Sequence, residues 1–242
     1  MKFFREENIK ALCESMVNDK FEELSQYDNE AEFDPAYEPI LMFVHRNIKS
    51  GRVLDVGCGS GASFNIFPDL TDAIEPNHER YIIAKKRGEE GVPSVDVVQG
   101  FVEALPFKDH AFSTILMINT WGHVRSDFEA LIEINRKLKS GGHFIFNISG
   151  DELDIYAGRA GYAPRNWRRI LRDFGFEIVE YREIKYTSGR KSGAKVSDHC
   201  VCVSKEEEFN PENLRKMQIV EVTTGLYKIN NFFPDGRDWR LK

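Results

Sequence analysis

The chain alternates between two hydrophobic periods over most of its length. Apolar residues at helical spacing indicate helices, whereas short apolar runs between glycines, prolines and polar residues indicate strands. Seven runs predict strands: 53–57, 72–75, 95–99, 113–118, 143–149, 176–184 and 199–204. Six segments predict helices: 3–25, 40–48 after Pro39, the residues after Ser60, 78–87, 128–138 and 167–174. The alternation is regular up to residue 150, which is typical of βαβ units.

Repeated strand–helix alternation with short connections predicts a parallel sheet with right-handed crossovers. The last two predicted strands are joined by the polar loop TSGRKSGAK, residues 187–195, and form an antiparallel pair. We therefore predict an α/β fold: a Rossmann-like, doubly wound, mostly parallel seven-stranded sheet with helices on both faces and an antiparallel last strand. The chain divides into three parts: an N-terminal helical cap or lid (1–50), a Rossmann-like core (51–204) and a C-terminal appendage packed on the core (205–242).

The stretch VLDVGCGSGAS, Val53 to Ser63, places three glycines directly after the first predicted strand. A glycine loop between a strand and a helix lets a ligand approach the backbone closely. Ligands of parallel sheets bind beyond the carboxyl ends of the strands. Further polar or glycine-containing stretches follow the next predicted strands, at Glu75, at 100–103 and at Asn119. Four segments are thus expected to converge on one rim.

The composition of the 242 residues, with 41% hydrophobic and 30% charged residues, is that of a soluble enzyme rather than a disordered chain. A formal net charge of −6 disfavours nucleic acid as a partner, because phosphate binding needs clustered Lys and Arg. No run approaches the roughly 20 apolar residues of a membrane helix. Acids stand near the N-terminus where a signal peptide is apolar. We expect a cytoplasmic protein, monomeric or homodimeric, without membrane contact.

The four cysteines show no spacing typical of a disulfide framework, which suits a reducing compartment. The sequence His199-Cys200-x-Cys202 resembles half of a metal site. However, no second pair of ligands completes a tetrahedral set, and the cysteines alternate with valines as in a strand. We predict no metal.

Spacing alone leaves the ligand of the glycine loop open. Gly57, Gly59 and Ala62 fit the dinucleotide pattern G-x-G-x-x-A, and Glu75 follows at about the 20-residue distance of a ribose-binding acid. A P-loop is excluded, because the loop lacks the Gly-Lys-Ser/Thr ending.

Asp55, at the end of the first predicted strand, separates the two remaining ligands. We expect it to face the loop, where a pyrophosphate would meet a like charge at a penalty of about 1–4 kcal/mol. S-adenosylmethionine carries a sulfonium, an ammonium, no phosphate and a ribose with two hydroxyls for Glu75. The acid therefore favours S-adenosylmethionine over a dinucleotide.

VLDVGCGSG resembles the first motif of class I S-adenosylmethionine-dependent methyltransferases of the small-molecule type. Three later stretches are similar to further motifs of that family: AIEPNHER with its ribose-binding acid, VQGFVEALPFKDHAFSTILMINTWGHV and LIEINRKLKSGGHFIF. The resemblance runs in order over about residues 40–204. It implies S-adenosylmethionine as cofactor, S-adenosylhomocysteine as product, and methyl transfer to an O, N or C atom of a small-molecule acceptor.

The resemblance also implies roles for individual residues. The glycines admit the methionine moiety, Glu75 accepts from both ribose hydroxyls, and Asn119 offers its carbonyl or side chain to the ammonium. Phe101 and Val102 lie along the adenine. The complete set of expected cofactor-binding residues is Asp55, Gly57, Cys58, Gly59, Gly61, Glu75, Pro76, Gly100, Phe101, Val102, Glu103, Asn119 and Thr120.

Phe101 departs from the family pattern, because many relatives have an acid there that binds the adenine amino group. Stacking, backbone contacts or Glu103 would have to replace it. His123 is the candidate catalytic base, since a histidine can take a proton near neutral pH. Candidate substrate-binding residues are Tyr27, Trp121, Tyr156, Arg159 and Tyr162, each with core packing or capping as the alternative.

Two other functions stay open on the sequence. One is a non-catalytic module that binds S-adenosylmethionine or a partner protein through the same fold. The other is an NAD(P)-dependent reductase, which the glycine spacing permits.

Overall fold

The computed structural model describes residues 38–149 except 68, 92, 125 and 126, and also residues 170–187, 195–211, 219–221 and 229–231. The predicted helix at 3–25 and most of the predicted C-terminal appendage lie outside the described residues.

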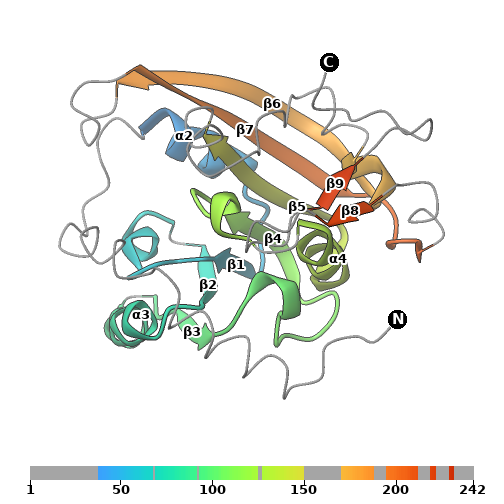
Figure 1. The fold of residues 1–242 in the computed structure, drawn as a ribbon. Coiled ribbons are helices and arrows are strands. Elements are labelled where there is room, and N and C mark those ends of the chain that lie inside the picture. Colours follow the sequence, from blue (N-terminus) through green and yellow to red (C-terminus); the bar gives the residue numbers. More distant parts are fainter. Residues whose placement is uncertain are drawn as a thin grey trace.

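Seven strands form one sheet in the order β3-β2-β1-β4-β5-β7-β6 (Figure 1). Their bounds are Val53–Val56 (β1), Leu70–Glu75 (β2), Asp96–Gln99 (β3), Phe112–Met117 (β4), Leu138–Ser149 (β5), Phe176–Thr187 (β6) and Lys195–Lys205 (β7). Strands β1 to β5 are parallel to their neighbours, whereas β7 runs antiparallel to β5 and β6. The predicted fold class is therefore confirmed. Two short strands, β8 (Ile219–Glu221) and β9 (Ile229–Asn231), pair in a separate sheet.

Helices cover both faces of the large sheet. Their bounds are Glu38–Asn47 (α2), His78–Glu90 (α3) and Asp127–Lys137 (α4), with 3₁₀ turns at Ala62–Asn65 (η3), Val102–Ala104 (η4) and Trp121–His123 (η5). Phe144 and Phe146 of β5 pack with α4 and residues 170–174 on one face. Ile145, between them, packs with α2 and α3 on the other. Successive side chains of β5 thus point to opposite faces of the sheet and contribute to two separate hydrophobic cores.

The predicted helix after Ser60 is the main departure from the sequence-based elements. Only the four residues of η3 are helical there, preceded by Gly61 in the left-handed region at φ 84°. Pro68 follows closely in the sequence, and a proline removes the backbone donor that a longer helix would need. The glycine loop therefore leads into a single turn.

The predicted turn at 139–142 is present, although β5 continues through it. Phe112 of β4 lies opposite Leu138, and Thr114 lies opposite His143, so four residues of β5 face only one residue of β4. Gly141, with φ 68°, supplies the left-handed conformation of this bulge.

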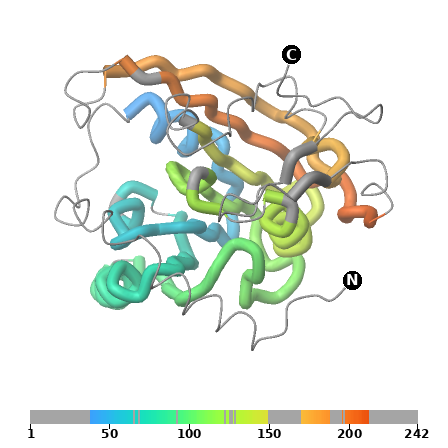
Figure 2. The backbone as a smooth tube through the Cα atoms, viewed as in Figure 1, coloured from blue at the N-terminus to red at the C-terminus, as the bar shows by residue number. Residues whose placement is uncertain are grey.

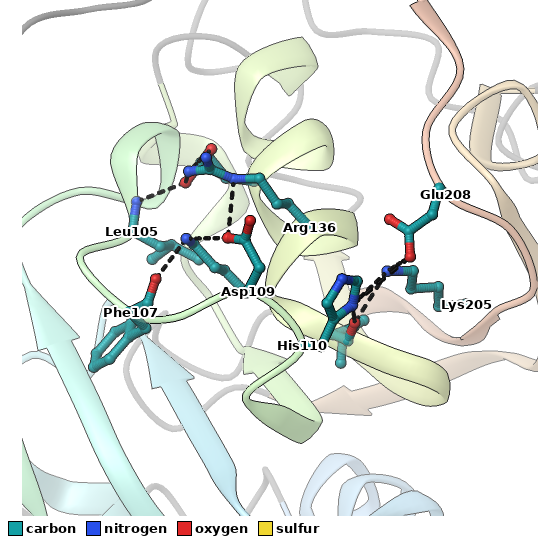
Figure 3. A network of polar contacts seen from close by, with 10 residues as sticks. Leu105, Phe107, Asp109, His110, Arg136, Lys205 and Glu208 are labelled. Atoms are coloured by element: carbon teal, nitrogen blue, oxygen red, sulfur yellow. Dashed lines mark hydrogen bonds and ion pairs between the residues drawn. The ribbon is translucent and has the colours of Figure 1, made fainter.

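Buried lysines join the amino-terminal ends of β4 and β5 to the end of β7 (Figure 3). Lys137, 3% exposed, donates to the carbonyl of Phe107 and, at 2.8 Å, to Asp109. Lys205, 1% exposed, donates to the carbonyl of Leu138 at 3.0 Å and pairs with Glu208. Figure 2 shows β6 and β7 running together along one edge of the molecule. This polar network fixes the end of the sheet at which β4 and β5 begin, and the site lies at the opposite end, where the parallel strands finish.

Asn135 of α4 generates a prediction on stability. Its side chain, 0% exposed, donates to the carbonyls of Phe174 and Glu207 at 2.8 and 2.9 Å and accepts from the amide of Phe209 at 3.1 Å. We expect Asn135→Leu to lower the free energy of unfolding by about 3 kcal/mol, because buried backbone groups lose their partners. Urea denaturation measures this. A change below about 0.5 kcal/mol, the range of a surface substitution, would contradict it.

Candidate functional site

The loops after β1, β2, β3 and β4 surround a cavity that is open to solvent. This is the rim that the sequence predicted, at the carboxyl ends of the parallel strands. The cavity is lined by Val56, Gly57, Ile74, Glu75, Pro76, Arg80, Gly100, Phe101, Val102, Glu103, Asn119, Thr120, His123 and Val124. Most of the expected cofactor-binding residues are therefore brought together.

The glycine loop packs tightly at its first glycine and leaves space at its second. Gly57 has φ 72°, and a Cβ there would lie 2.4 Å from the methyl group of Thr120. Gly59 has φ 58°, and a Cβ there would meet no atom within 4 Å. The loops after β1 and β4 can approach each other only because residue 57 is a glycine. The open space beside Gly59 is room that a ligand could use.

Glu75, at the end of β2, ties two loops together although it is 4% exposed. Its Oε2 accepts from the amide of Gly59, and its Oε1 accepts from the amide of Asn77, both at 2.9 Å. Burial raises the pKa of Glu75, and these two hydrogen bonds and the charge of Arg80 oppose the rise. The side chain is thus held at the cavity wall in a fixed orientation by two backbone amides, as an acceptor for a diol requires.

Asp55 is placed differently from the prediction that it faces the ligand. It is 6% exposed and does not line the cavity, and its Oδ2 accepts from the hydroxyl of Ser63 at 2.5 Å. Burial raises the pKa of Asp55 to about 6, and the hydrogen bond from Ser63 opposes part of that rise. Asp55 therefore braces the end of the glycine loop and adds negative potential behind it.

The loop after β4 is held by β5. Asn119 has φ 55°, and its amide donates to Oδ1 of Asn147 at 2.7 Å. Nδ2 of Asn147 donates back to Oδ1 of Asn119, also at 2.7 Å. The hydroxyl of Thr120 donates to the carbonyl of Ile118 at 3.0 Å. The two residues that line the cavity here are fixed by hydrogen bonds from outside it.

Trp121 requires a correction, because it was a candidate for substrate binding. Its indole is 2% exposed and stacks on Phe146 with a centroid separation of 5.2 Å. The apolar ring is buried under the loop, so Trp121 anchors the loop to β5 and does not reach the cavity.

Cys58 also points into the core rather than the cavity. Burial, followed by the charges of Asp55 and Glu75, raises the pKa of its thiol well above the ordinary value. At neutral pH it is a packed thiol. Gly59 and Gly61 likewise do not line the cavity, so the loop meets it through Gly57.

His123 and Glu103 stand on the cavity wall in the 3₁₀ turns η5 and η4. His123 is exposed there. Glu103 lies near Glu129 of α4, and burial together with Glu103 and Glu133 raises the pKa of Glu129 to about 7. Phe101 and Val102 contribute apolar wall while remaining 4% and 6% exposed. This part of the cavity is apolar with acids at its edge.

The remaining candidate substrate-binding residues, Tyr27, Tyr156, Arg159 and Tyr162, lie outside the described residues. Within the described part of the chain, no group of three His, Cys, Asp or Glu side chains is arranged to hold a metal. Nδ1 of His199 lies 2.8 Å from the hydroxyl of Tyr181, whereas Cys200 and Cys202 belong to the core on the α2 face.

Arg80 and Asn147 were not among the site residues predicted from the sequence. Arg80 follows the helix cap Asn77, whose Oδ1 accepts from the Arg80 amide at 3.0 Å. The first turn of a helix that follows a parallel strand lies at the rim of the sheet. The position of Arg80 in such a turn could therefore have indicated that it lies near the site. Asn147 interrupts the apolar run HFIFNIS. A buried amide side chain needs a hydrogen-bond partner, so an asparagine within an apolar run could have indicated a polar contact at this position.

The titration of Asp55 gives a testable consequence. A carboxyl in the unfolded chain has a pKa near 3.9, so between about pH 4 and pH 6 the folded state binds more protons and the free energy of unfolding falls as pH rises. We expect Asp55→Asn to remove this fall, gaining about 2–3 kcal/mol relative to the parent protein between pH 4 and pH 7. Denaturant titrations across pH measure it, with the exposed acid variant Asp69→Asn as control. Parallel profiles would contradict the raised pKa.

Known proteins resemble this chain over the same region. The family described as methyltransferase domain matches residues 54–146. The chain is 25% identical over 146 residues to the fatty-acid O-methyltransferase of Mycolicibacterium smegmatis, covering 58% of this chain and 49% of that protein. It is 29% identical over 131 residues to a tRNA U34 carboxymethyltransferase of Cellvibrio japonicus, covering 50% and 40%. The chain spans about half the length, or less, of these curated relatives.

A solved structure shares the fold over a larger part. The S-adenosylmethionine-dependent methyltransferase of Thermotoga maritima superposes with a TM-score of 0.60 at 24% identity, covering 78% of this chain and 99% of that one. The family match runs from β1 into β5 and includes every loop that lines the cavity. Residues 54–146 therefore match a methyltransferase domain, and the chain shares the fold of an S-adenosylmethionine-dependent methyltransferase.

Proposed function

We propose that this protein transfers the methyl group of S-adenosylmethionine to an O, N or C atom of a small-molecule acceptor. The observation that carries the proposal is the carboxylate of Glu75. It lines the cavity at the end of β2 and is oriented by the amides of Gly59 and Asn77. A carboxylate held in this way is a strong acceptor for the two hydroxyls of a ribose.

The cavity residues fit the other parts of the cofactor. Ile74, Phe101 and Val102 offer apolar surface for the adenine, and Glu103 is an acceptor at its edge. We assign the methionine moiety to the side of Gly57, where Asn119 and Thr120 stand. Asp55 and Glu75 place negative charge near this side, which favours the ammonium and the sulfonium.

Methyl transfer is a displacement at sulfur in which charge is dispersed, so positioning and exclusion of water supply most of the acceleration. S-adenosylmethionine supplies the electrophilic methyl group when it is bound. An acceptor that must lose its proton needs a base as well. His123 is our candidate for this base, because it is exposed at the cavity wall.

The acceptor is proposed as a small molecule. The named acceptors of the relatives differ, since one acts on a fatty acid and another on a tRNA. The net charge of −6 and the acids around the cavity favour the smaller acceptor, because tRNA binding needs a basic surface. No helix among the described residues is long and apolar enough to span a membrane. We propose the cytoplasm as the site of the reaction, consistent with the free thiols of Cys58, Cys200 and Cys202.

The reductase alternative is disfavoured by the loop itself. A pyrophosphate is bound at the amino terminus of an α-helix, whereas the glycine loop here leads into the four-residue turn η3. It would also meet the negative charges of Asp55 and Glu75. The non-catalytic module has the same expected binding as the enzyme, and only turnover distinguishes the two.

Substitution of Glu75 tests the proposed cofactor site. We expect Glu75→Gln to weaken binding of S-adenosylhomocysteine by at least about 1.5 kcal/mol, because hydrogen bonds to a charged acceptor are lost. Isothermal titration calorimetry measures the dissociation constant. Glu79→Gln, an exposed acid of α3 outside the cavity, is the matched control and should bind as the parent protein does. An unchanged constant for Glu75→Gln would move the ribose elsewhere, and tight NADH binding without S-adenosylhomocysteine binding would support the reductase.

Turnover tests catalysis and the role of His123. The parent protein, incubated with S-adenosylmethionine and a panel of fatty acids, phenols and amines, should release S-adenosylhomocysteine with at least one class. We expect His123→Gln to lower kcat for that acceptor about 100-fold, the usual worth of a general base, with the dissociation constant for S-adenosylhomocysteine unchanged. Equal kcat values would leave His123 a wall residue. Cofactor binding without turnover across the panel would favour the binding module.

A further inference from the structure

Asn147 is a buried amide that does not line the cavity, yet it bonds to a residue that does. Its side chain is 2% exposed in strand β5, one residue beyond the pairing of Phe146 with Met117 of β4. It makes two hydrogen bonds of 2.7 Å to Asn119, one to the backbone amide and one to the side-chain oxygen.

The chemistry of these two bonds fixes their direction. A backbone N–H only donates, so the atom of Asn147 that accepts from Asn119 is Oδ1, and its Nδ2 must then face the side-chain oxygen of Asn119. That oxygen is consequently engaged inside the loop. Asn119 has two oxygens that a ligand could use, and the backbone carbonyl is the one that does not bond to Asn147.

The backbone of Asn119 is in a conformation that needs support. At φ 55° a non-glycine residue lies in the left-handed region, which asparagine tolerates better than most residues but which is still unfavourable. The two bonds from Asn147 offset that penalty, and the burial of Trp121 against Phe146 holds the other end of the same loop. Strand β5 thus determines the orientation of the peptide groups around Asn119.

We propose that Asn147 is a positioning residue for the methionine end of the cofactor. By holding Asn119 in the left-handed conformation, it keeps the Asn119 backbone carbonyl in the orientation that accepts a hydrogen bond from the ligand's ammonium group. The inference rests on the proposed function, in which this side of the cavity receives the methionine moiety. It assigns to β5 a role in ligand selection that the cavity lining alone does not reveal.

Two ligands that differ only at the amino-acid end provide the test. S-adenosylhomocysteine carries the ammonium, whereas 5′-methylthioadenosine keeps the adenine, the ribose and the sulfur but lacks it. We expect Asn147→Leu, which has similar volume and no hydrogen-bonding group, to weaken S-adenosylhomocysteine about tenfold and to change 5′-methylthioadenosine by less than about twofold. Isothermal titration calorimetry on the full chain measures both. A residue that merely stabilised the fold would weaken both ligands alike.

A pair of substitutions at residue 119 isolates the backbone conformation. Glycine adopts positive φ without support, so Asn119→Gly should bind S-adenosylhomocysteine several-fold more tightly than Asn119→Ala does, and adding Asn147→Leu to Asn119→Gly should have little further effect. Asn119→Ala lacks the side-chain oxygen that bonds to Asn147, and alanine does not adopt positive φ as readily as glycine. Its affinity for S-adenosylhomocysteine should therefore fall about tenfold. If Asn147→Leu does not fold, the comparison of Asn119→Gly with Asn119→Ala tests the proposal without it.

The matched control is Asn135→Leu, which removes an equally buried amide whose partners, in Phe174, Glu207 and Phe209, do not line the cavity. It should lower the melting temperature and leave both dissociation constants unchanged. Equal losses for both ligands in Asn147→Leu, or equal binding by the glycine and alanine variants at 119, would overturn the proposal. Absence of S-adenosylhomocysteine binding in the parent protein would instead overturn the proposed function on which it rests.

Discussion

The bridge made by Glu75 is the contact on which the geometry of the candidate site depends. Its two carboxylate oxygens accept from backbone amides of different loops, Gly59 after β1 and Asn77 after β2. Backbone donors cannot move without moving the chain, so these bonds set the position of the glycine loop relative to the start of α3. Burial opposes ionisation of this carboxylate, and the donors together with Arg80 counter it. A single side chain therefore shapes the loop and presents an acceptor to the cavity.

The opposite wall of the cavity, formed by the loop after β4, is also held by side chains that contact backbone and side-chain groups of the loop, but these side chains are uncharged. Strand β5 supports the loop after β4 through Phe146, which stacks on Trp121, and through Asn147, which bonds to Asn119. Gly57 joins the two walls, because the absence of a side chain there lets the loop after β1 contact Thr120. The cavity is thus held by residues that lie behind its surface, and its rigidity comes from the sheet.

Negative charge gathers around this cavity at a cost in stability. Asp55 is buried with a pKa of about 6, and Glu129, which is half-buried, has a pKa of about 7 beside Glu103. Carboxylates shielded from water in this way destabilise a fold unless a ligand or partner compensates them. A cationic ligand would recover part of that free energy on binding. The buried lysines at the opposite end of the strands already have their acidic partners in Asp109 and Glu208.

Local patterns in the sequence were enough to determine the strand and helix alternation, the parallel sheet and the rim at which its loops meet. Apolar runs and glycine positions depend on neighbouring residues, so they are readable from the chain. The short turn η3 and the inward indole of Trp121 were not, because each depends on packing that the local pattern does not specify.

Only the tertiary structure decided that Asp55 braces Ser63 instead of facing the cavity, that Arg80 lines it, and that Asn147 holds Asn119. Asn119 and Asn147 meet through the register between β4 and β5, which aligns Met117 with Phe146. A register is fixed by the burial of both strands at once. The sequence by itself therefore determined which loops form the site, and the pairing of distant strands decided which side chains hold it in shape.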